Sequence, residues 1–142
     1  MNAAPPGPDA VRVDGLRMRY GSTEVVKGID LAVGAGEIVS LLGPSGCGKT
    51  TTLRAIAGFA EPHAGTVRIH GDDVTDVAPN KRDIGMVFQG YALFPHLSVF
   101  DNVAYGLRMR RLPRAEIAER VARALELVKL AGFADRRPKQ LS

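Results

Sequence analysis

The spacing of hydrophobic residues predicts β-structure in the first third of the chain. Between residues 11 and 33, apolar and polar positions alternate in two runs, and the link at residues 20–23 contains Gly21 and Ser22, which favour a turn. This region is predicted to form an antiparallel hairpin. Residues 37–42 (EIVSLL) are mostly apolar, as expected of a strand buried on both faces of a parallel sheet.

The middle of the chain predicts one helix and two further strands. Leu53 and Ile56 recur at helical spacing just after residue 50, and Gly58 is a natural helix stop. Residues 66–71 alternate and are expected to form an edge strand. Residues 83–89 (DIGMVFQ) are predicted to form a second buried strand that ends at Gln89, where ligands of open α/β sheets bind.

Two more helices are predicted in the last third of the chain, as a helical subdomain. Ser98 can cap a helix that ends near Arg111, with Asp101 three residues after the cap. The second helix begins after Pro113 and is closed by Gly132. The apolar stripe of this second helix consists of Ile117, Val121, Leu125 and Val128.

Composition narrows the class of protein. The chain has 142 residues, of which 45% are hydrophobic, and this suits one globular α/β domain. Residues 1–10 lack the basic and apolar regions of a signal peptide and are expected to be a disordered tail. No apolar run approaches the roughly 18 residues of a membrane span, so we expect a cytoplasmic protein that reaches a membrane only through a partner. The net charge is +4, but acidic residues are interleaved with basic ones, and nucleic acid is not an expected ligand.

The strongest chemical signal is the sequence GPSGCGKT at residues 43–50, between a predicted strand and a predicted helix. The segment consists of Gly43, Pro44, Ser45, Gly46, Cys47, Gly48, Lys49 and Thr50. Its glycines let backbone N–H groups converge on phosphate oxygens at a helix N-terminus. Lys49 supplies charge for the β- and γ-phosphates, and the Thr50 hydroxyl can bind Mg²⁺. This context predicts a Walker A loop that binds a nucleoside triphosphate rather than an incidental glycine-rich turn.

Cys47 is the only cysteine in the chain, which excludes an intrachain disulfide and favours a reducing compartment. Two interpretations stay open for its side chain. In the first, only the backbone N–H of Cys47 matters. In the second, the helix N-terminus and Lys49 activate the thiol, and bound ATP would block its alkylation.

The order of motifs resembles the nucleotide-binding subunit of ABC transporters. The resemblance covers residues 11–142 and rests on the aromatic hairpin, GPSGCGKT, MVFQGYALFPHLSVFDNVAYGL and the ending PKQLS. It is greatest to importer ATPases of the polyamine, ferric-iron, maltose and phosphonate type. The implied fold is α/β, with a P-loop NTPase core (an incomplete parallel sheet) and an N-terminal antiparallel β-subdomain within residues 11–89. Residues 90–142 would hold the Q-loop segment and the helical subdomain.

The resemblance also implies roles for residues outside the phosphate loop. Tyr20 matches the aromatic residue that stacks on adenine, and Val25 would pack near the base; the alternative is a tyrosine that only closes the hairpin. Gln89 matches the Q-loop glutamine, which contacts Mg²⁺ and the attacking water; the alternative is a surface glutamine. Lys49 and Gln89 would be catalytic, Thr50 and Gln89 would hold Mg²⁺, and the backbone as far as Thr51 would cradle phosphate oxygens.

Partners follow from the same resemblance. Residues 90–97 are unusually apolar for a loop. They match the segment that leads to the contact with the membrane-spanning permease subunits, although Leu93 and Phe94 could also fold back onto their own subdomain. A second ATPase subunit would bind head to tail, and a solute-binding protein would act indirectly. The implied location is the inner face of the cell membrane. His96 alone is expected to be structural.

The resemblance breaks off at residues 141–142, which match the first two positions of the LSGGQ signature. We therefore expect the chain to be the N-terminal part of an ATP-hydrolysing subunit that drives solute import. The Walker B aspartate and the catalytic glutamate have no match in these residues, so this part alone is expected to be inactive. The alternatives are a nucleotide-binding fragment without turnover and a soluble ABC ATPase that acts on DNA or the ribosome.

Overall fold

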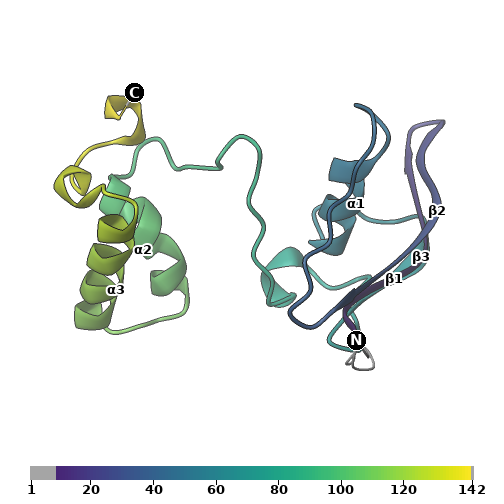
Figure 1. The fold of residues 1–142 in the computed structure, drawn as a ribbon, viewed down its shortest axis with the longest axis horizontal. Helices are drawn as coiled ribbons and strands as arrows, with labels where there is room; N and C mark the ends of the chain where they lie inside the picture. Colours follow the sequence, from purple (N-terminus) through teal and green to yellow (C-terminus); the bar gives the residue numbers. More distant parts are fainter. Residues whose placement is uncertain (1–8, 142) are drawn as a thin grey trace, which may run out of the picture. The chain divides into compact units, whose positions relative to one another are not determined.

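The computed structural model describes residues 9–141 and divides the chain into two compact units, residues 1–86 and residues 87–142. Figure 1 shows both units as a ribbon. The first contains β1 (Asp9–Tyr20), β2 (Thr23–Gly34), α1 (Lys49–Ile56), β3 (Ala64–Ile69) and β4 (Asp72–Asp73). The second contains α2 (Val99–Met109) and α3 (Arg114–Leu127). Short 3₁₀ turns lie at Pro79–Lys81, Ala131–Phe133 and Pro138–Gln140.

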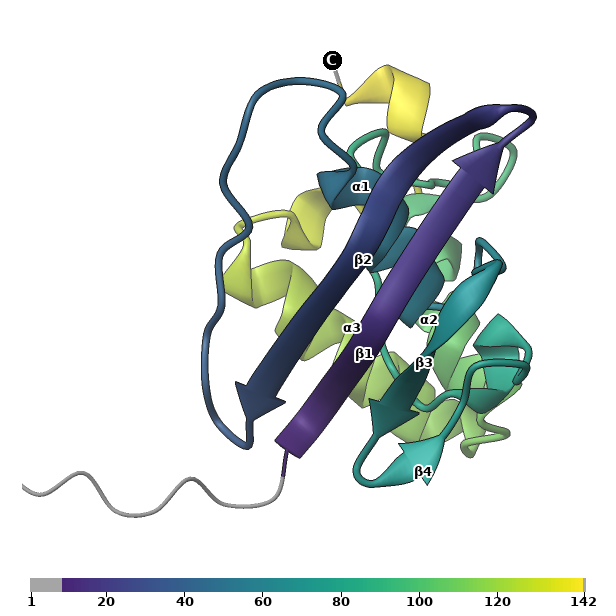
Figure 2. The ribbon, with the colours of Figure 1, turned by 90° about the vertical axis from the view of Figure 1, so that its right-hand side faces the viewer.

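The predicted hairpin is confirmed. β1 and β2 pair antiparallel, and Tyr20 faces Thr23 across the turn. The sheet has the order β2-β1-β3-β4 (Figure 2). The strand predicted at residues 66–71 is present as β3, but its prediction as an edge strand is wrong. His70 (φ 51°) and Gly71 (φ 91°) turn the chain back, so that β4 pairs with β3 and takes the edge.

The core of the first unit lies between the sheet and α1, which Figure 2 shows behind β2. Alternation along the strands places apolar side chains on this inner face, as the sequence pattern requires. The buried members of this cluster are Val13, Leu16, Met18, Val26, Ala55, Val67, Ile69 and Val74. Through Ala55 the helix that follows the phosphate loop is fixed to the sheet.

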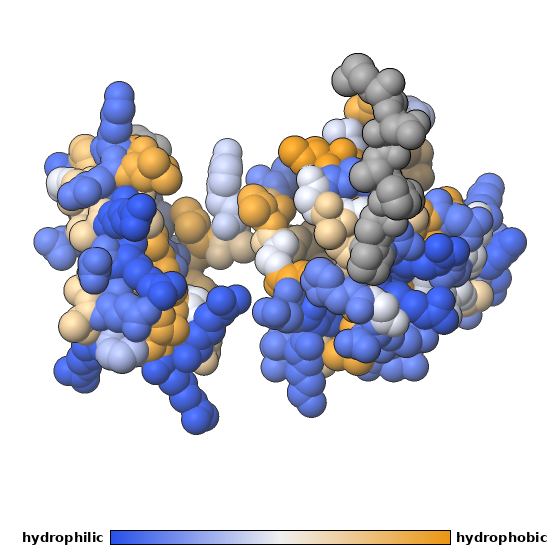
Figure 3. Space-filling model, turned by 60° about the horizontal axis from the view of Figure 1, so that its bottom comes forward, coloured by the Kyte–Doolittle hydropathy of each residue, from blue (hydrophilic) through white to orange (hydrophobic). Residues whose placement is uncertain are grey.

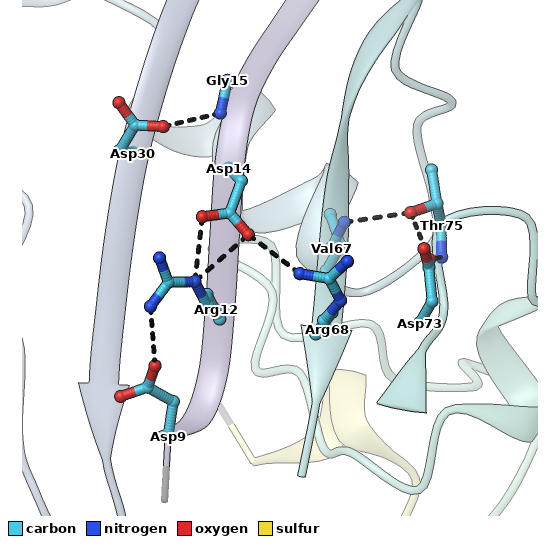
Figure 4. Close-up of polar contacts among 9 residues, drawn as sticks. All are labelled: Asp9, Arg12, Asp14, Gly15, Asp30, Val67, Arg68, Asp73 and Thr75. Atoms are coloured by element: carbon cyan, nitrogen blue, oxygen red, sulfur yellow. Dashed lines mark hydrogen bonds and ion pairs between the residues drawn. The ribbon is translucent and has the colours of Figure 1, made fainter. Parts of the chain in front are cut away.

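Polar side chains on the sheet connect neighbouring strands (Figure 4). Asp14 of β1 accepts hydrogen bonds from Arg12 Nε (2.9 Å) and from Arg68 Nη1 of β3 (3.3 Å). At the irregularity between Val13 and Leu16, the Asp30 carboxylate accepts the Gly15 N–H at 2.7 Å. Exposed ion pairs of this kind add little stability, typically about 0–1 kcal/mol each.

The segment after β4 is held to β3 by the Thr75 hydroxyl. This hydroxyl accepts the Val67 N–H (2.9 Å) and donates to Asp73 (2.6 Å), as Figure 4 shows. The hydrogen bonds from the hydroxyl and from the backbone N–H of Thr75 lower the pKa of Asp73. Thr75 therefore fixes the segment after β4 to the neighbouring strand β3.

Two predicted strands are not formed. Residues 37–42 and 83–88 have no regular secondary structure, and Gln89 lies in a turn. Ile38, Leu42 and Val87 are 93%, 91% and 94% exposed. Within residues 9–141 every strand pairing is antiparallel, and no strand lies beside either segment to accept its backbone hydrogen bonds. The predicted parallel sheet is thus absent from the described residues, and apolar side chains reach the surface among polar ones (Figure 3).

In the second unit the predicted cap of α2 is confirmed. The Ser98 Oγ accepts the Asp101 N–H at 3.0 Å and donates to the Asp101 carboxylate at 2.7 Å. These contacts, together with Arg108, lower the pKa of Asp101. The cap therefore satisfies an N–H group of the first turn and places a negative charge near the positive end of the helix dipole.

The second predicted helix is confirmed as α3, which packs beside α2 (Figure 1). Its buried stripe contains Ile117, Val121 and Leu125, as predicted. The predicted end at Gly132 is wrong, because α3 ends at Leu127 and Lys129 adopts a left-handed conformation (φ 59°). Val128 lies beyond the helix and is 59% exposed, so it does not belong to the stripe.

The predicted tail at residues 1–10 is too long at its C-terminal end. Asp9 and Ala10 belong to β1, and residues 1–8 lie outside the described residues. None of the helices within residues 9–141 is long and apolar enough to cross a membrane.

Candidate functional site

The loop at residues 43–48 opens directly into α1, as predicted. Gly48 is the N-cap of the helix in a left-handed conformation (φ 99°). A Cβ at this position would lie 3.0 Å from Val26 Cγ2 and 3.1 Å from the Val25 carbonyl oxygen. Glycine therefore allows the loop both its turn and its close approach to β2.

A buried threonine, which sequence reasoning missed, fixes the start of α1. The Thr52 hydroxyl donates to the Gly48 carbonyl at 3.0 Å, and the Thr52 N–H donates to the same oxygen at 2.8 Å. Thr52 is 3% exposed. The sequence held only a weak signal for this contact, because a hydroxyl in the first turn of a helix can also face solvent.

The Lys49 ammonium lies within the loop. It donates to the carbonyl oxygens of Gly43 (2.8 Å) and Pro44 (2.7 Å) and contacts Cys47 Sγ at 3.4 Å. The Cys47 side chain is exposed. The first turn of α1 has no acidic residue, so the charge of Lys49 adds to the positive end of the helix dipole. Both charges favour an anion at this end of the helix.

A cavity of about 620 Å³ lies between β2 and the phosphate loop. This volume is in the range of about 300–1,000 Å³ that is typical of small-molecule sites. The residues that line it are Thr23, Glu24, Val25, Val26, Lys27, Ile29, Leu41, Leu42, Gly46, Cys47, Gly48, Lys49 and Thr52. The cavity thus joins the wall predicted for the base, at Val25, to the loop predicted for the phosphates.

Other predicted site residues belong to the first unit without lining this cavity. They are Tyr20, Gly43, Pro44, Ser45, Thr50 and Thr51. Tyr20 is 52% exposed at the end of β1 and pairs with Thr23, which does line the cavity. The stacking role of Tyr20 and the metal-binding role of Thr50 stay predictions.

Gln89 belongs to the second unit. Its side chain is exposed, and it lies in a turn closed by the Tyr91 N–H, which donates to the Phe88 carbonyl at 3.0 Å. Its contact with Mg²⁺ and the attacking water stays a prediction.

The residues present fit a metal that arrives with a nucleotide. Among residues 9–141, no group of three or more His, Cys, Asp and Glu side chains is placed to hold a metal ion. Mg²⁺ needs no such group, because it usually keeps waters and binds few protein oxygens besides those of substrate phosphates. The exposed Thr50 hydroxyl, at the second position of α1, is an oxygen of the required type.

Arg82 is a second residue that sequence reasoning missed. It is 4% exposed, and its guanidinium donates to four backbone carbonyls of the first unit. Burial lowers the pKa of Arg82, while Asp76 acts in the opposite direction. In the sequence, an arginine between a lysine and an aspartate predicts an exposed charged side chain.

The glycine-rich loop, the helix that it opens, Lys49 and the adjoining cavity define a P-loop nucleotide-binding protein. A profile of the ABC transporter family matches residues 26–142, and the chain belongs to this family. The resemblance of its sequence motifs to that family is therefore confirmed.

Named relatives match at high identity. The spermidine/putrescine import ATP-binding protein PotA of Acidothermus cellulolyticus is 60% identical over 124 residues, 87% of this chain and 32% of that protein. The protein of the same name from Haemophilus influenzae is 46% identical over 142 residues, 100% of this chain and 38% of that protein. The Fe(3+) ions import ATP-binding protein FbpC of Photorhabdus laumondii is 52% identical over 132 residues, 93% of this chain and 38% of that protein. The chain thus spans about a third of the length of these relatives.

Proposed function

We propose that this chain supplies the phosphate-binding part of an ATPase that drives solute import across a membrane. The observation that carries the proposal is the phosphate loop beside a nucleotide-sized cavity, in a chain 46–60% identical to proteins named as import ATP-binding proteins. Relatives named for polyamines and for ferric ions match at similar identity. We therefore assign the selection of the transported solute to the membrane and solute-capturing subunits and not to this chain.

In this proposal most of the residues that bind the nucleotide belong to the first unit. Lys49 neutralises charge on the β- and γ-phosphates, and backbone N–H groups from Gly46 to Thr51 bind phosphate oxygens. Thr50 and Gln89 would hold the Mg²⁺ that accompanies the nucleotide, and this ion would lower the negative charge of the phosphates. Gln89 also orients the attacking water. The catalytic glutamate and the opposing signature sequence are expected from outside these residues, the latter from a second ATPase subunit bound head to tail.

The segment after Gln89 is proposed to contact the permease subunits at the inner face of the membrane. Tyr91 and Leu93 are 80% and 52% exposed, which suits a surface that a partner covers. Phe94 packs on its own unit, because the centroids of its ring and the Tyr105 ring are 4.5 Å apart. In this proposal Tyr91 and Leu93 face the permease, whereas Phe94 folds back onto its own unit. A solute-binding protein would act through the permease.

Affinity purification of the intact protein from solubilised membranes tests the transport proposal. An integral membrane subunit is expected to co-purify in stoichiometric amount, and its recovery should fall when Tyr91 and Leu93 are replaced by serine. Replacement of the exposed Leu127, on α3 of the same unit, is the matched control and should leave recovery unchanged. Co-purification with ribosomes or DNA instead of a membrane subunit would support a soluble ABC ATPase.

Tyr20→Ala is expected to weaken ATP binding by the intact protein several-fold or more. Stacking on an aromatic ring contributes roughly 1–3 kcal/mol per base, and this contribution is lost with the ring. Titration with a fluorescent ATP analogue measures the change, and Tyr20→Phe should retain most of the affinity. Equal affinity of the alanine variant and the wild type would leave Tyr20 with the role of closing the hairpin only.

A further inference from the structure

The helix that carries the phosphate loop is too short to be stable alone. α1 has eight residues, whereas isolated helices shorter than about 12–15 residues are marginal in water. Its orientation must therefore be fixed by tertiary contacts at both ends. At the N-terminus the N-cap Gly48 packs closely against β2, where a Cβ at residue 48 would lie 3.0 Å from Val26 Cγ2 and 3.1 Å from the Val25 carbonyl oxygen.

The C-terminus of α1 is held partly by its own chain. The Leu53 carbonyl accepts the Ala57 N–H at 3.0 Å, and the Arg54 carbonyl accepts the Phe59 N–H at 2.8 Å. The last two carbonyls, those of Ala55 and Ile56, accept hydrogen bonds from Arg82 Nη1 at 2.8 and 2.9 Å. A cation at this position also interacts favourably with the negative end of the helix dipole.

Arg82 connects this helix end to the segment that follows β4. Its Nη2 donates to the Thr75 carbonyl at 2.9 Å, and its Nε donates to the Val77 carbonyl at 2.7 Å. Thr75 is in turn bonded to β3 through its hydroxyl, which accepts the Val67 N–H. One buried guanidinium thereby ties the phosphate-loop helix to the sheet by a continuous chain of hydrogen bonds.

Gly58 is an independent part of the same arrangement. It ends the helix in a left-handed conformation (φ 78°), and a Cβ there would lie 2.6 Å from Nε and 2.8 Å from Cζ of Arg82. Any side chain at residue 58 would therefore displace the guanidinium. Two residues far apart in the sequence thus build one contact, and each can be varied separately.

We propose that Arg82 is a positioning residue that holds α1 where the phosphate loop can bind the β- and γ-phosphates of ATP. The inference rests on the proposed function. Because α1 has eight residues and begins at Lys49, release of its C-terminal end also moves the loop at its N-terminal end. The wall of the cavity formed by β2 does not depend on Arg82, so contacts with the base are retained.

The test compares ATP with AMP, which lacks the β- and γ-phosphates. Dissociation constants for both are measured by calorimetry on the intact protein, for the wild type and for Arg82→Gln and Gly58→Ala. The ratio of the AMP constant to the ATP constant is expected to fall about tenfold in both variants, as for the loss of charge-assisted hydrogen bonds. Arg82→Lys, which retains the charge and one donor group, should recover part of the ratio.

Matched controls separate positioning from general destabilisation. Arg68→Gln removes a partly exposed arginine of β3, and Gly71→Ala places a side chain at φ 91° with no atom within 4 Å of its Cβ. Both should keep the wild-type ratio. If Arg82→Gln does not fold, Gly58→Ala decides the matter: an unchanged ratio, or failure of this variant to fold, contradicts a positioning role. A wild-type protein that binds ATP no better than AMP would instead contradict the proposed function.

Discussion

Lys49→Ala is expected to lower the rate of ATP hydrolysis by the intact protein at least about 100-fold, the effect typical of losing one preorganised charge-stabilising group. The Lys49 ammonium lies 2.7–2.8 Å from two carbonyls of the phosphate loop, so its charge is already held at the loop. Removal of this charge leaves the β- and γ-phosphates of the nucleotide without their cationic partner. The helix dipole and the loop N–H groups remain, and weak nucleotide binding should therefore persist.

Steady-state phosphate release measures this effect, with Lys81→Ala as the matched control. Lys81 is an exposed lysine of the first unit, in the 3₁₀ turn Pro79–Lys81 and outside the residues that line the cavity. The control should keep wild-type turnover. Equal turnover in the Lys49 variant and the wild type would mean that another site hydrolyses the ATP.

Gly65→Ala is expected to destabilise the first unit by about 3 kcal/mol or more, in the range of severe backbone clashes. Gly65 of β3 lies against the irregularity of β1, and a Cβ there would be 2.5 Å from the Gly15 carbonyl oxygen and 2.7 Å from that of Asp14. Backbone atoms in a paired sheet cannot move aside as a flexible side chain could. The substitution must therefore separate β1 from β3 locally.

Gly71→Ala is the control for this substitution, because Gly71 has the same φ of 91° and no atom within 4 Å of its Cβ. It carries only the strain of a left-handed alanine, about 1–2 kcal/mol. Urea unfolding monitored by circular dichroism should give a clearly lower midpoint for Gly65→Ala than for Gly71→Ala. Similar midpoints would show that conformational strain alone, and not the approach of two backbones, limits residue 65.

The elements that the sequence predicted correctly are those specified by local contacts. The hairpin follows from alternation around Gly21 and Ser22, and α2 from a cap between residues three positions apart, Ser98 and Asp101. Residues 37–42 and 83–89 carry the apolar composition of strands, but a strand also needs a neighbour for its backbone groups. No described strand lies beside them, so composition alone did not produce the element.

The same distinction between local and distant contacts applies to the candidate site. The phosphate loop was predictable because glycine, lysine and threonine occur at fixed spacing between a strand-like run and a helix. Arg82 was not predictable, since its four carbonyl partners lie between 5 and 27 residues away and no pattern of residue types encodes them. The prediction that β3 is an edge strand was wrong for a related reason. His70 and Gly71 have positive φ and turn the chain back, so that β4 pairs with β3.

Hydrogen exchange of the intact protein, with and without MgATP, shows whether the phosphate loop binds the triphosphate. If the loop binds the triphosphate, MgATP should slow exchange of the backbone N–H groups from Gly46 to Thr51, and AMP should slow it much less. The exposed C-terminal turn of α3 near Leu127 should exchange at the same rate in both conditions. Unchanged exchange in the loop at saturating MgATP would contradict nucleotide binding at this loop.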